Sequence, residues 1–106
     1  KISFTITLNS FLNWYQSQAK VCYYCGIPED RLKANKAFFG KGKRKIYRLT
    51  IDRINNDLGY SEKNIVLACQ RCNVIKSNFF TSEEMKQLAI KFIKPKWYFP
   101  IVKVSL

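Results

Sequence analysis

The sequence contains no histidine, and only seven of its 106 residues are aspartate or glutamate, against nineteen lysines and arginines. The missing histidine excludes any site that uses an imidazole as a general base. The shortage of acidic residues leaves a net charge of +12, which predicts an anionic partner, either nucleic acid or an anionic membrane surface. We favour nucleic acid, because no basic amphipathic helix stands out.

Long hydrophobic runs are also missing from the chain. No stretch reaches the roughly eighteen apolar residues that a transmembrane helix requires, and the N-terminus shows no secretory signal. We therefore expect a cytoplasmic protein with no membrane partner. The length and a hydrophobic content of 47% predict a single domain spanning residues 1–106. A domain of this size often needs a staple such as a metal ion.

Basic residues concentrate in one part of the chain. Eight of the nineteen lie between Arg31 and Arg48, in a stretch without an acidic residue. Four of them surround Gly40 and Gly42, as in a flexible basic loop. A solvated surface is the alternative interpretation, but the clustering favours a loop that grips phosphates. The four loop residues are Lys41, Lys43, Arg44 and Lys45.

The second half of the chain predicts two strands followed by a short helix. Apolar and polar residues alternate over 46–54, which indicates a strand. Residues 55–59 have the composition of a turn, and 65–68 form a second short apolar strand. A short helix is expected over 69–78.

Longer helices are predicted on either side of this unit. Thr7 can cap a helix that ends by about Lys20, and its apolar face is Leu8, Phe11, Leu12 and Tyr15. Residues 81–84 form a capping box for a last helix, which Pro95 should stop. The inward face expected for that helix is Met85, Leu88, Ala89 and Phe92.

The four cysteines form two Cys-x-x-Cys pairs, Cys22 with Cys25 and Cys69 with Cys72. Two intervening residues let both sulfurs of a pair face one tetrahedral ion at about 2.3 Å, and two pairs complete a closed, structural zinc site. Two disulfides are the first alternative, and the missing secretory signal disfavours them. A thioredoxin-like redox motif is the second, but it requires a βαβ context and a single copy. The sequence therefore predicts one structural Zn²⁺.

Polar residues lie close to this site in the predicted fold. Asp52 and Arg53 end the first strand, Asn64 precedes the second, and Asn73 follows Cys72 directly. Each alone has an ordinary explanation as a turn or surface residue. Together they fall on a unit pinned by metal, where the oxygens of Asp52 and Asn73 suit a hard divalent cation.

Residues 49–78 resemble the ββα-metal core of the HNH endonucleases, on the string LTIDRINNDLGYSEKNIVLACQRCNVIKSN. The similarity is to the phage and bacterial branch of that family, which has an Asp-Arg-Ile-x-Asn strand end, a Gly-Tyr-Ser/Thr-x-x-Asn turn and a Cys-x-x-Cys-Asn-x-x-Lys helix. The string CYYCG at 22–26 is similar to the first zinc knuckle of the branch. The looser match runs from about Thr7 to Phe92. The resemblance implies an α+β fold: a ββα-metal (HNH) core with a four-cysteine zinc site and flanking helices.

The resemblance also implies roles for single residues. Asp52 and Asn73 would ligate a catalytic Mg²⁺ or Mn²⁺, and Asn64 would brace the hairpin loop. The four cysteines match the structural zinc ligands. The expected partner is DNA, in a prokaryotic or phage-infected cell. The expected DNA-binding residues are Lys41, Lys43, Arg44, Lys45, Arg48, Arg71 and Lys76.

Arg53 stands where many HNH enzymes have their general-base histidine, and this is a departure from the wider family. Arginine keeps its proton in proteins, so Arg53 cannot be the base; we expect it to contact the scissile phosphate. Tyr47 and Tyr60 are alternative bases, although packing is the more ordinary role for both. The predicted function is a metal-dependent DNA endonuclease, by nicking or double-strand cleavage. The alternative is a zinc-stabilised nucleic-acid-binding module that has lost cleavage.

Overall fold

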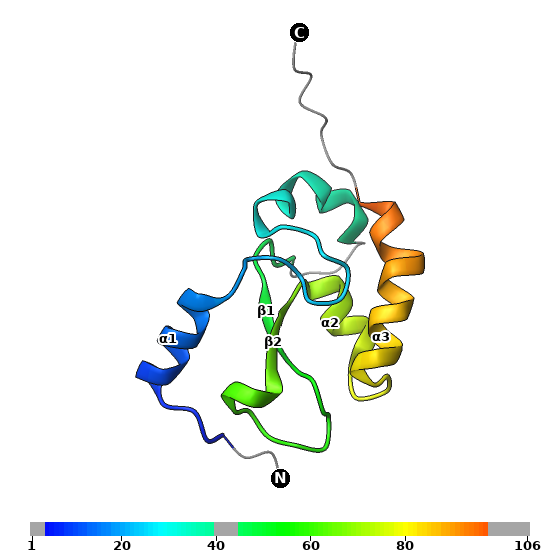
Figure 1. Ribbon diagram of the computed structural model, residues 1–106. Helices are drawn as coiled ribbons and strands as arrows, with labels where there is room; N and C mark the ends of the chain where they lie inside the picture. Colours follow the sequence, from blue (N-terminus) through cyan, green and yellow to red (C-terminus); the bar gives the residue numbers. More distant parts are fainter. Residues whose placement is uncertain (1–3, 40–44, 98–106) are drawn as a thin grey trace, which may run out of the picture.

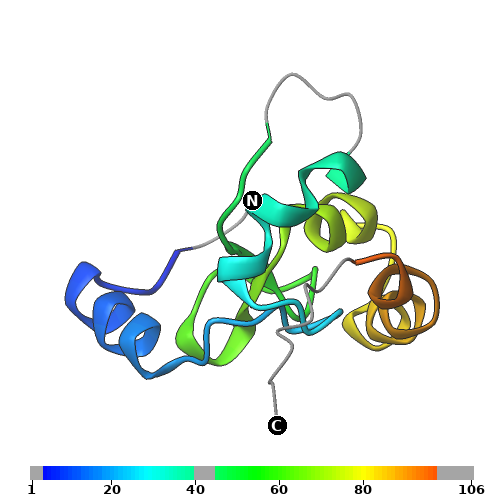
Figure 2. The same ribbon diagram turned by 90° about the horizontal axis from the view of Figure 1, so that it is seen from above.

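A two-stranded antiparallel hairpin lies at the centre of the computed structural model, which describes residues 4–39 and 45–97 (Figure 1). Strand β1 is Thr50–Arg53 and strand β2 is Ile65–Ala68, with Thr50 opposite Ala68 and Arg53 opposite Ile65. Two views show α1 on one side of the hairpin and α2 and α3 on the other (Figures 1 and 2). The fold is the predicted α+β arrangement of a hairpin followed by a helix.

Strand β2 matches the prediction, whereas β1 is shorter than the expected 46–54. In the residues before β1, side-chain oxygens accept hydrogen bonds from backbone N–H groups. The amide of Ile46 donates to Gln70 Oε1 at 2.9 Å, and the amide of Leu49 donates to Glu29 Oε2 at 2.9 Å. Alternating hydrophobicity cannot distinguish such a segment from a strand, because both are extended.

Helix α2, Gln70–Lys76, covers the hairpin face that carries Thr50 and Asp52. Its N-cap is Cys69, whose Sγ accepts a hydrogen bond from the amide of Cys72 at 3.4 Å. A cysteine is an unusual cap. Cys69 therefore has two roles, as the first cysteine of the second Cys-x-x-Cys pair and as the N-cap of α2.

Helix α1, Leu8–Ser17, begins with a capping box between Thr7 and Ser10. The predicted apolar face is wrong in part, because Leu8 is 72% exposed and Leu12 is also exposed. The face that packs against the protein includes Trp14 and Tyr15. Spacing alone allowed either face, and the large indole of Trp14 buries more apolar area than a leucine.

Helix α3, Ser82–Leu88, begins at the predicted capping box of Thr81 and Glu84 and continues as a π-helical turn, Ala89–Ile93. The buried side chains are Met85, Ala89 and Ile93, whereas Phe92, predicted to face inward, is 57% exposed. A π-turn has more residues than an α-turn, so the inward position moves from Phe92 to Ile93. A 3-10 turn, Lys94–Lys96, contains Pro95 and ends the helix.

Three further 3-10 helices complete the described part: Glu29–Arg31, Lys33–Phe39 and Glu62–Asn64. The core is formed by the hairpin, by α2, by α3 and by the segment that follows α1. Its fully buried residues include Ile27, Leu32 and Met85. No helix in the described ranges is long and apolar enough to cross a membrane.

Candidate active site and metal centre

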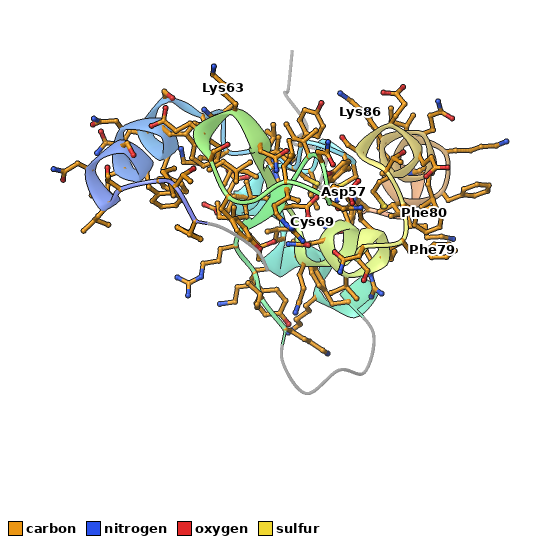
Figure 3. All side chains as sticks on the ribbon, turned by 90° about the horizontal axis from the view of Figure 1, so that it is seen from below. Asp57, Lys63, Cys69, Phe79, Phe80 and Lys86 are labelled. Carbon is orange, nitrogen blue, oxygen red and sulfur yellow. The ribbon has the colours of Figure 1, made fainter. Side chains whose placement is uncertain are left out.

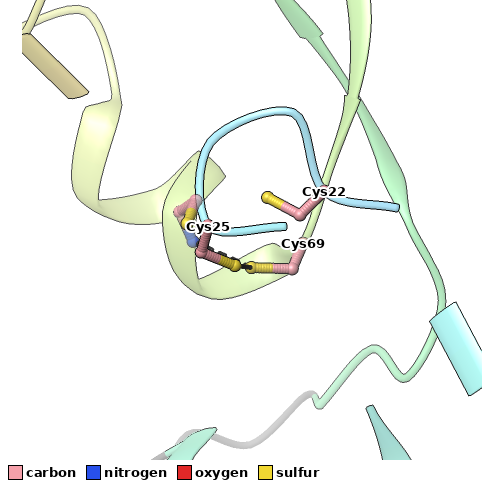
Figure 4. A group of neighbouring side chains, drawn as sticks. Cys22, Cys25 and Cys69 are labelled. Atoms are coloured by element: carbon pink, nitrogen blue, oxygen red, sulfur yellow. Dashed lines mark hydrogen bonds between the residues drawn. The ribbon is translucent and has the colours of Figure 1, made fainter. Parts of the chain in front are cut away.

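The four cysteines come together in the core, and their sulfur atoms all lie within 4.8 Å of one another. All four side chains are buried, and Cys25 Sγ lies 3.8 Å from Cys69 Sγ (Figure 4). Sulfurs on a tetrahedral zinc ion at about 2.3 Å are separated by about 3.8 Å, whereas a disulfide requires about 2.05 Å. The cluster therefore has the donor set and spacing of a structural metal site.

Backbone contacts fix the first cysteine pair. The amide of Gly26 donates to the carbonyl of Cys22 at 2.9 Å, and the amide of Tyr23 donates to the carbonyl of Leu67 at 2.8 Å. Gly26 has a φ of +78°, which closes the turn and favours glycine. The pair is thus held against β2 at Leu67, two residues before Cys69.

Two N–H groups point at the sulfurs of this cluster. Trp97 Nε1 donates to Cys25 Sγ at 3.1 Å, and the amide of Cys72 donates to Cys69 Sγ at 3.4 Å. Thiolates are the ligand form of cysteine, and N–H donors stabilise the negative charge on sulfur, so both contacts suit a cluster that holds a metal ion.

Asp52 is a residue of β1 whose side chain faces α2, and one of its carboxylate oxygens contacts other protein groups. Its Oδ2 accepts a 2.6 Å hydrogen bond from Tyr24 Oη and lies 3.3 Å from Lys76 Nζ. Its Oδ1 accepts no hydrogen bond within the described ranges. Because no buried side-chain polar atom there is left without a partner, Oδ1 reaches solvent and is available to a ligand.

Asn73, on α2, is fixed in a similar way. Its Nδ2 donates to Thr50 Oγ1 at 2.8 Å and to the carbonyl of Ile51 at 3.3 Å. The carbonyl can only accept, so it orients the amide with Oδ1 on the other side. Oδ1 has no hydrogen-bond partner in residues 4–39 and 45–97, and by the same reasoning it reaches solvent. Asp52 and Asn73 therefore flank the same stretch of β1, each with one available oxygen.

The structure corrects the expectation that Lys76 binds DNA phosphate. The side chain is fully buried. Its ammonium donates to the carbonyl of Arg53 at 2.9 Å and to Asn56 Oδ1 at 2.6 Å, in addition to its contact with Asp52. Its position three residues after Asn73 predicted the same helix face as Asn73 and a reach to phosphate. The shared face is the one that packs on β1, so the ammonium is buried there.

Asn64 closes the loop between the two strands. Its Oδ1 accepts from the amide of Asn55 at 2.8 Å, and its Nδ2 donates to the carbonyls of Asn55 at 3.1 Å and Gly59 at 2.8 Å. The side chain is buried. All three bonds join the start of β2 to the loop that follows β1, so Asn64 fixes the loop and contributes no free oxygen.

Arg53 is largely occupied by the same loop. Its Nη1 donates to the carbonyls of Asn56 and Leu58, both at 3.0 Å, and Nη2 lies 3.4 Å from Asn78 Oδ1. The guanidinium also lies over the ring of Tyr60, 5.4 Å from its centroid. Arg53 Nε donates no hydrogen bond in the described part of the chain, and it reaches solvent because no buried polar atom there is left without a partner.

The structure separates the tyrosines that were considered as bases. Tyr47 packs edge-to-face on Phe39, with ring centroids 5.5 Å apart, at the border of the core. Tyr60 supports Arg53. The tyrosine that contacts the candidate site is Tyr24, which the sequence analysis missed. Burial, then the hydrogen bond and charge of Asp52, raise the pKa of Tyr24, so its hydroxyl is a donor. Sequence spacing could not have shown which tyrosine of the Cys22–Cys25 pair points inward.

The predicted DNA-binding residues other than Lys76 divide into three groups. Lys45 and Arg48 are exposed, and Arg71 is half-buried. The hydrogen bond from Ile46 to Gln70 holds residues 45–48 beside the first turn of α2, which carries Arg71. Lys41, Lys43 and Arg44 lie outside the described residues.

Comparison with known proteins gives one strong match among solved structures. The chain is 36% identical to the rare-cutting HNH restriction endonuclease PacI, with a TM-score of 0.74. The alignment covers 91% of this chain and 67% of PacI. No family model matches the sequence, and no curated protein matches it.

Proposed function

The chain belongs to the HNH endonuclease family, and from this membership we propose that it is a DNA endonuclease that hydrolyses phosphodiester bonds with a divalent metal ion. The observation that supports this proposal most directly is the pair of available oxygens on Asp52 and Asn73. Both are hard donors of the type that Mg²⁺ and Mn²⁺ prefer. Both lie between β1 and α2, where the ββα-metal fold was expected to hold its ion.

Asp52 Oδ1 and Asn73 Oδ1 would hold the proposed catalytic ion. The chemistry that it would supply there is polarisation of the scissile phosphate and stabilisation of charge on the leaving oxygen. The protein's contribution is to keep both ligands in place before DNA arrives. Tyr24 holds the second oxygen of Asp52, and Thr50 with Ile51 holds the amide of Asn73.

Arg53 and Asn64 act on the same loop in this proposal. Asn64 ties the loop to β2. Arg53 Nη1 donates hydrogen bonds to two loop carbonyls. Its Nε faces solvent, where a phosphate oxygen can accept a charge-assisted hydrogen bond. Arg53 is therefore proposed as an electrostatic group.

DNA is proposed to lie across the N-terminal turn of α2 and the segment that leads into β1. Lys45 and Arg48 are exposed there, and Arg71 is adjacent. Contacts from these residues, and from Lys41, Lys43 and Arg44, supply phosphate binding without sequence information. The four-cysteine site is proposed to hold one structural Zn²⁺, since a closed Cys₄ set with N–H donors to its sulfurs suits that ion.

A plasmid-nicking assay tests the proposed function. We expect supercoiled DNA to be converted to the nicked or linear form only when Mg²⁺ or Mn²⁺ is added to protein that already contains zinc. Asn73→Ala should abolish cleavage while leaving the zinc content unchanged. Thr81→Ala, at the cap of α3, changes a residue with no proposed DNA or metal contact, so it is the matched control and should cleave as wild type does.

The result also separates the two candidate functions. The absence of histidine keeps a non-catalytic DNA-binding module as the alternative. DNA binding with no cleavage under either metal would support that module and contradict the enzyme.

A further inference from the structure

Lys76 places its ammonium 3.3 Å from Oδ2 of the candidate catalytic carboxylate, Asp52. An ammonium has three N–H donors, and Lys76 Nζ contacts three acceptors: Asp52 Oδ2, the carbonyl of Arg53 and Asn56 Oδ1. The side chain is fully buried, and all three contacts hold its ammonium beside the carboxylate.

The charges around Asp52 are unusual for a site that holds a divalent cation by itself. Asp52 is the one carboxylate among the buried residues of the described chain, and the buried ammonium of Lys76 lies 3.3 Å from its Oδ2. The single negative charge is thus already paired with a positive charge. Affinity for hard divalent ions rises with the number of charged ligands, and this site has its single carboxylate already compensated.

We propose that Lys76 is a positioning residue that makes catalytic-ion binding depend on DNA. Lys76 satisfies the buried Asp52 without a metal, so the free protein folds with its ligands in place but binds Mg²⁺ or Mn²⁺ weakly. The scissile phosphate supplies the missing negative charge and oxygen ligands, and the ion then binds together with the substrate. The inference rests on the proposed function of this same site.

A purely structural role for Lys76 leads to the opposite expectation. If the lysine only stapled α2 to β1, its removal would loosen Asp52 and weaken or leave unchanged the affinity for the ion. In our proposal, removing the ammonium leaves an uncompensated carboxylate, so affinity for the ion rises even if the fold is less stable. The sign of the change in affinity distinguishes the two roles.

The first measurement is a titration of the zinc-loaded free protein with Mn²⁺, in which the loss of the free-ion EPR signal reports binding. We expect wild type to bind weakly and Lys76→Met to bind about tenfold more tightly, or more. Lys63→Met is the matched control, since Lys63 is exposed and projects away from the body of the molecule (Figure 3). It removes the same charge and should titrate as wild type does. Lys76→Gln serves as the second neutral variant if Lys76→Met does not fold.

Tight Mn²⁺ binding by the free wild type, in the low micromolar range, would overturn the proposal. So would unchanged or weaker binding by the folded Lys76 variant, or an equal gain in Lys63→Met. If neither neutral variant folds, the wild-type titration decides between these outcomes.

The second measurement follows the coupling itself. Anisotropy of a labelled duplex gives DNA affinity with and without Ca²⁺, and a gel run afterwards checks that the DNA is intact. Linkage requires DNA and ion to strengthen each other by the same factor, so Ca²⁺ should tighten DNA binding by wild type and less so by Lys76→Met. A wild type that neither binds nor cuts DNA defeats the proposed function, whereas a cutting wild type with no coupling defeats only this inference.

Discussion

The burial of Asp52 destabilises the fold little because one carboxylate oxygen contacts protein donors and the other faces solvent. A buried carboxylate without partners is strongly destabilising, and here Oδ2 takes both the Tyr24 hydroxyl and the Lys76 ammonium. The second oxygen can therefore remain available to a ligand while the folded state is still satisfied. The same division occurs in Asn73, whose nitrogen is bound and whose oxygen is available.

Tyr24 offers a direct test of this arrangement. Tyr24→Phe keeps the ring and removes one hydrogen bond to a charged, buried acceptor, which should lower the free energy of unfolding by about 1.5–3 kcal/mol. Urea denaturation of the zinc-loaded protein measures the change. Tyr23→Phe is the matched control, because this neighbouring tyrosine is exposed and should change stability by less than about 0.5 kcal/mol. Equal stability of the two variants would show that the 2.6 Å contact does not contribute.

Arg53 is predicted to act on the reaction as well as on the loop. Arg53→Ala should lower the cleavage rate by roughly 10²–10³, the usual effect of losing one preorganised donor to a developing charge. Arg53→Lys should recover only part of the rate, because an ammonium lacks the planar fork that binds two partners at once. Single-turnover cleavage under excess enzyme measures both rates.

The loop contacts of Arg53 require a control of their own. Asn78→Ala removes the weak 3.4 Å partner of Nη2 and leaves the guanidinium in place. It should cleave nearly as fast as wild type. Full activity of Arg53→Ala would show that the residue has no catalytic role.

The elements that carry strong local signals were predictable from sequence. Strand β2 and the caps of α1 and α3 occur where composition placed them, because a capping box or a short apolar run is determined locally. The length of β1, the inward face of α1 and the exposure of Phe92 were not predictable. Each depends on a tertiary contact or on a π-turn that no local pattern records.

The candidate site was predictable in part for the same reason. Asp52, Asn64 and Asn73 lie at positions that motif order identifies, and the structure places all three around one hairpin. Tyr24 and the true environment of Lys76 come from contacts between segments far apart in sequence. Residue type alone favoured an exposed lysine, and only the packing of α2 on β1 shows the buried one.

Helix α2 should depend on the metal more than on its own cap. Cys69→Ser retains a side chain that is a good N-cap, so any loss beyond a few tenths of a kcal/mol comes from the missing ligand. We expect a loss of several kcal/mol, since the binding energy of a structural metal is folding energy, together with a zinc content well below one ion per chain. Urea denaturation and elemental analysis measure the two effects.

Thr81→Ala is the comparison for this variant, because Thr81 caps α3 and contacts no cysteine ligand in the described residues. It should cost about 1 kcal/mol, the usual value of a cap, and leave the metal content unchanged. A Cys69→Ser protein with normal stability and no zinc would contradict a structural metal site.

The molecule as a whole carries a charge of +12, but its positive residues are unequally placed with respect to the hairpin. Lys45 and Arg48 lie on the segment before β1, which the hydrogen bond from Ile46 to Gln70 ties to α2 next to Arg71. Lysines in the π-helical and 3-10 turns that follow α3, namely Lys91, Lys94 and Lys96, are also exposed. General attraction to a polyanion would involve both groups of basic residues. A defined binding face would involve only the group beside α2.

Salt dependence distinguishes a defined binding face from general attraction. Neutralising Lys43, Arg44 and Lys45 together should weaken DNA binding and make the slope of log affinity against log salt shallower by about 2–3, since each lost phosphate contact lowers it by about 0.9. Fluorescence anisotropy of a labelled duplex over a series of salt concentrations measures the slope. The matched control neutralises the three lysines that follow α3, which removes the same net charge and should change the slope by less than one contact. Equal slopes for the two triple variants would mean that total charge drives binding and that the face beside α2 has been wrongly assigned.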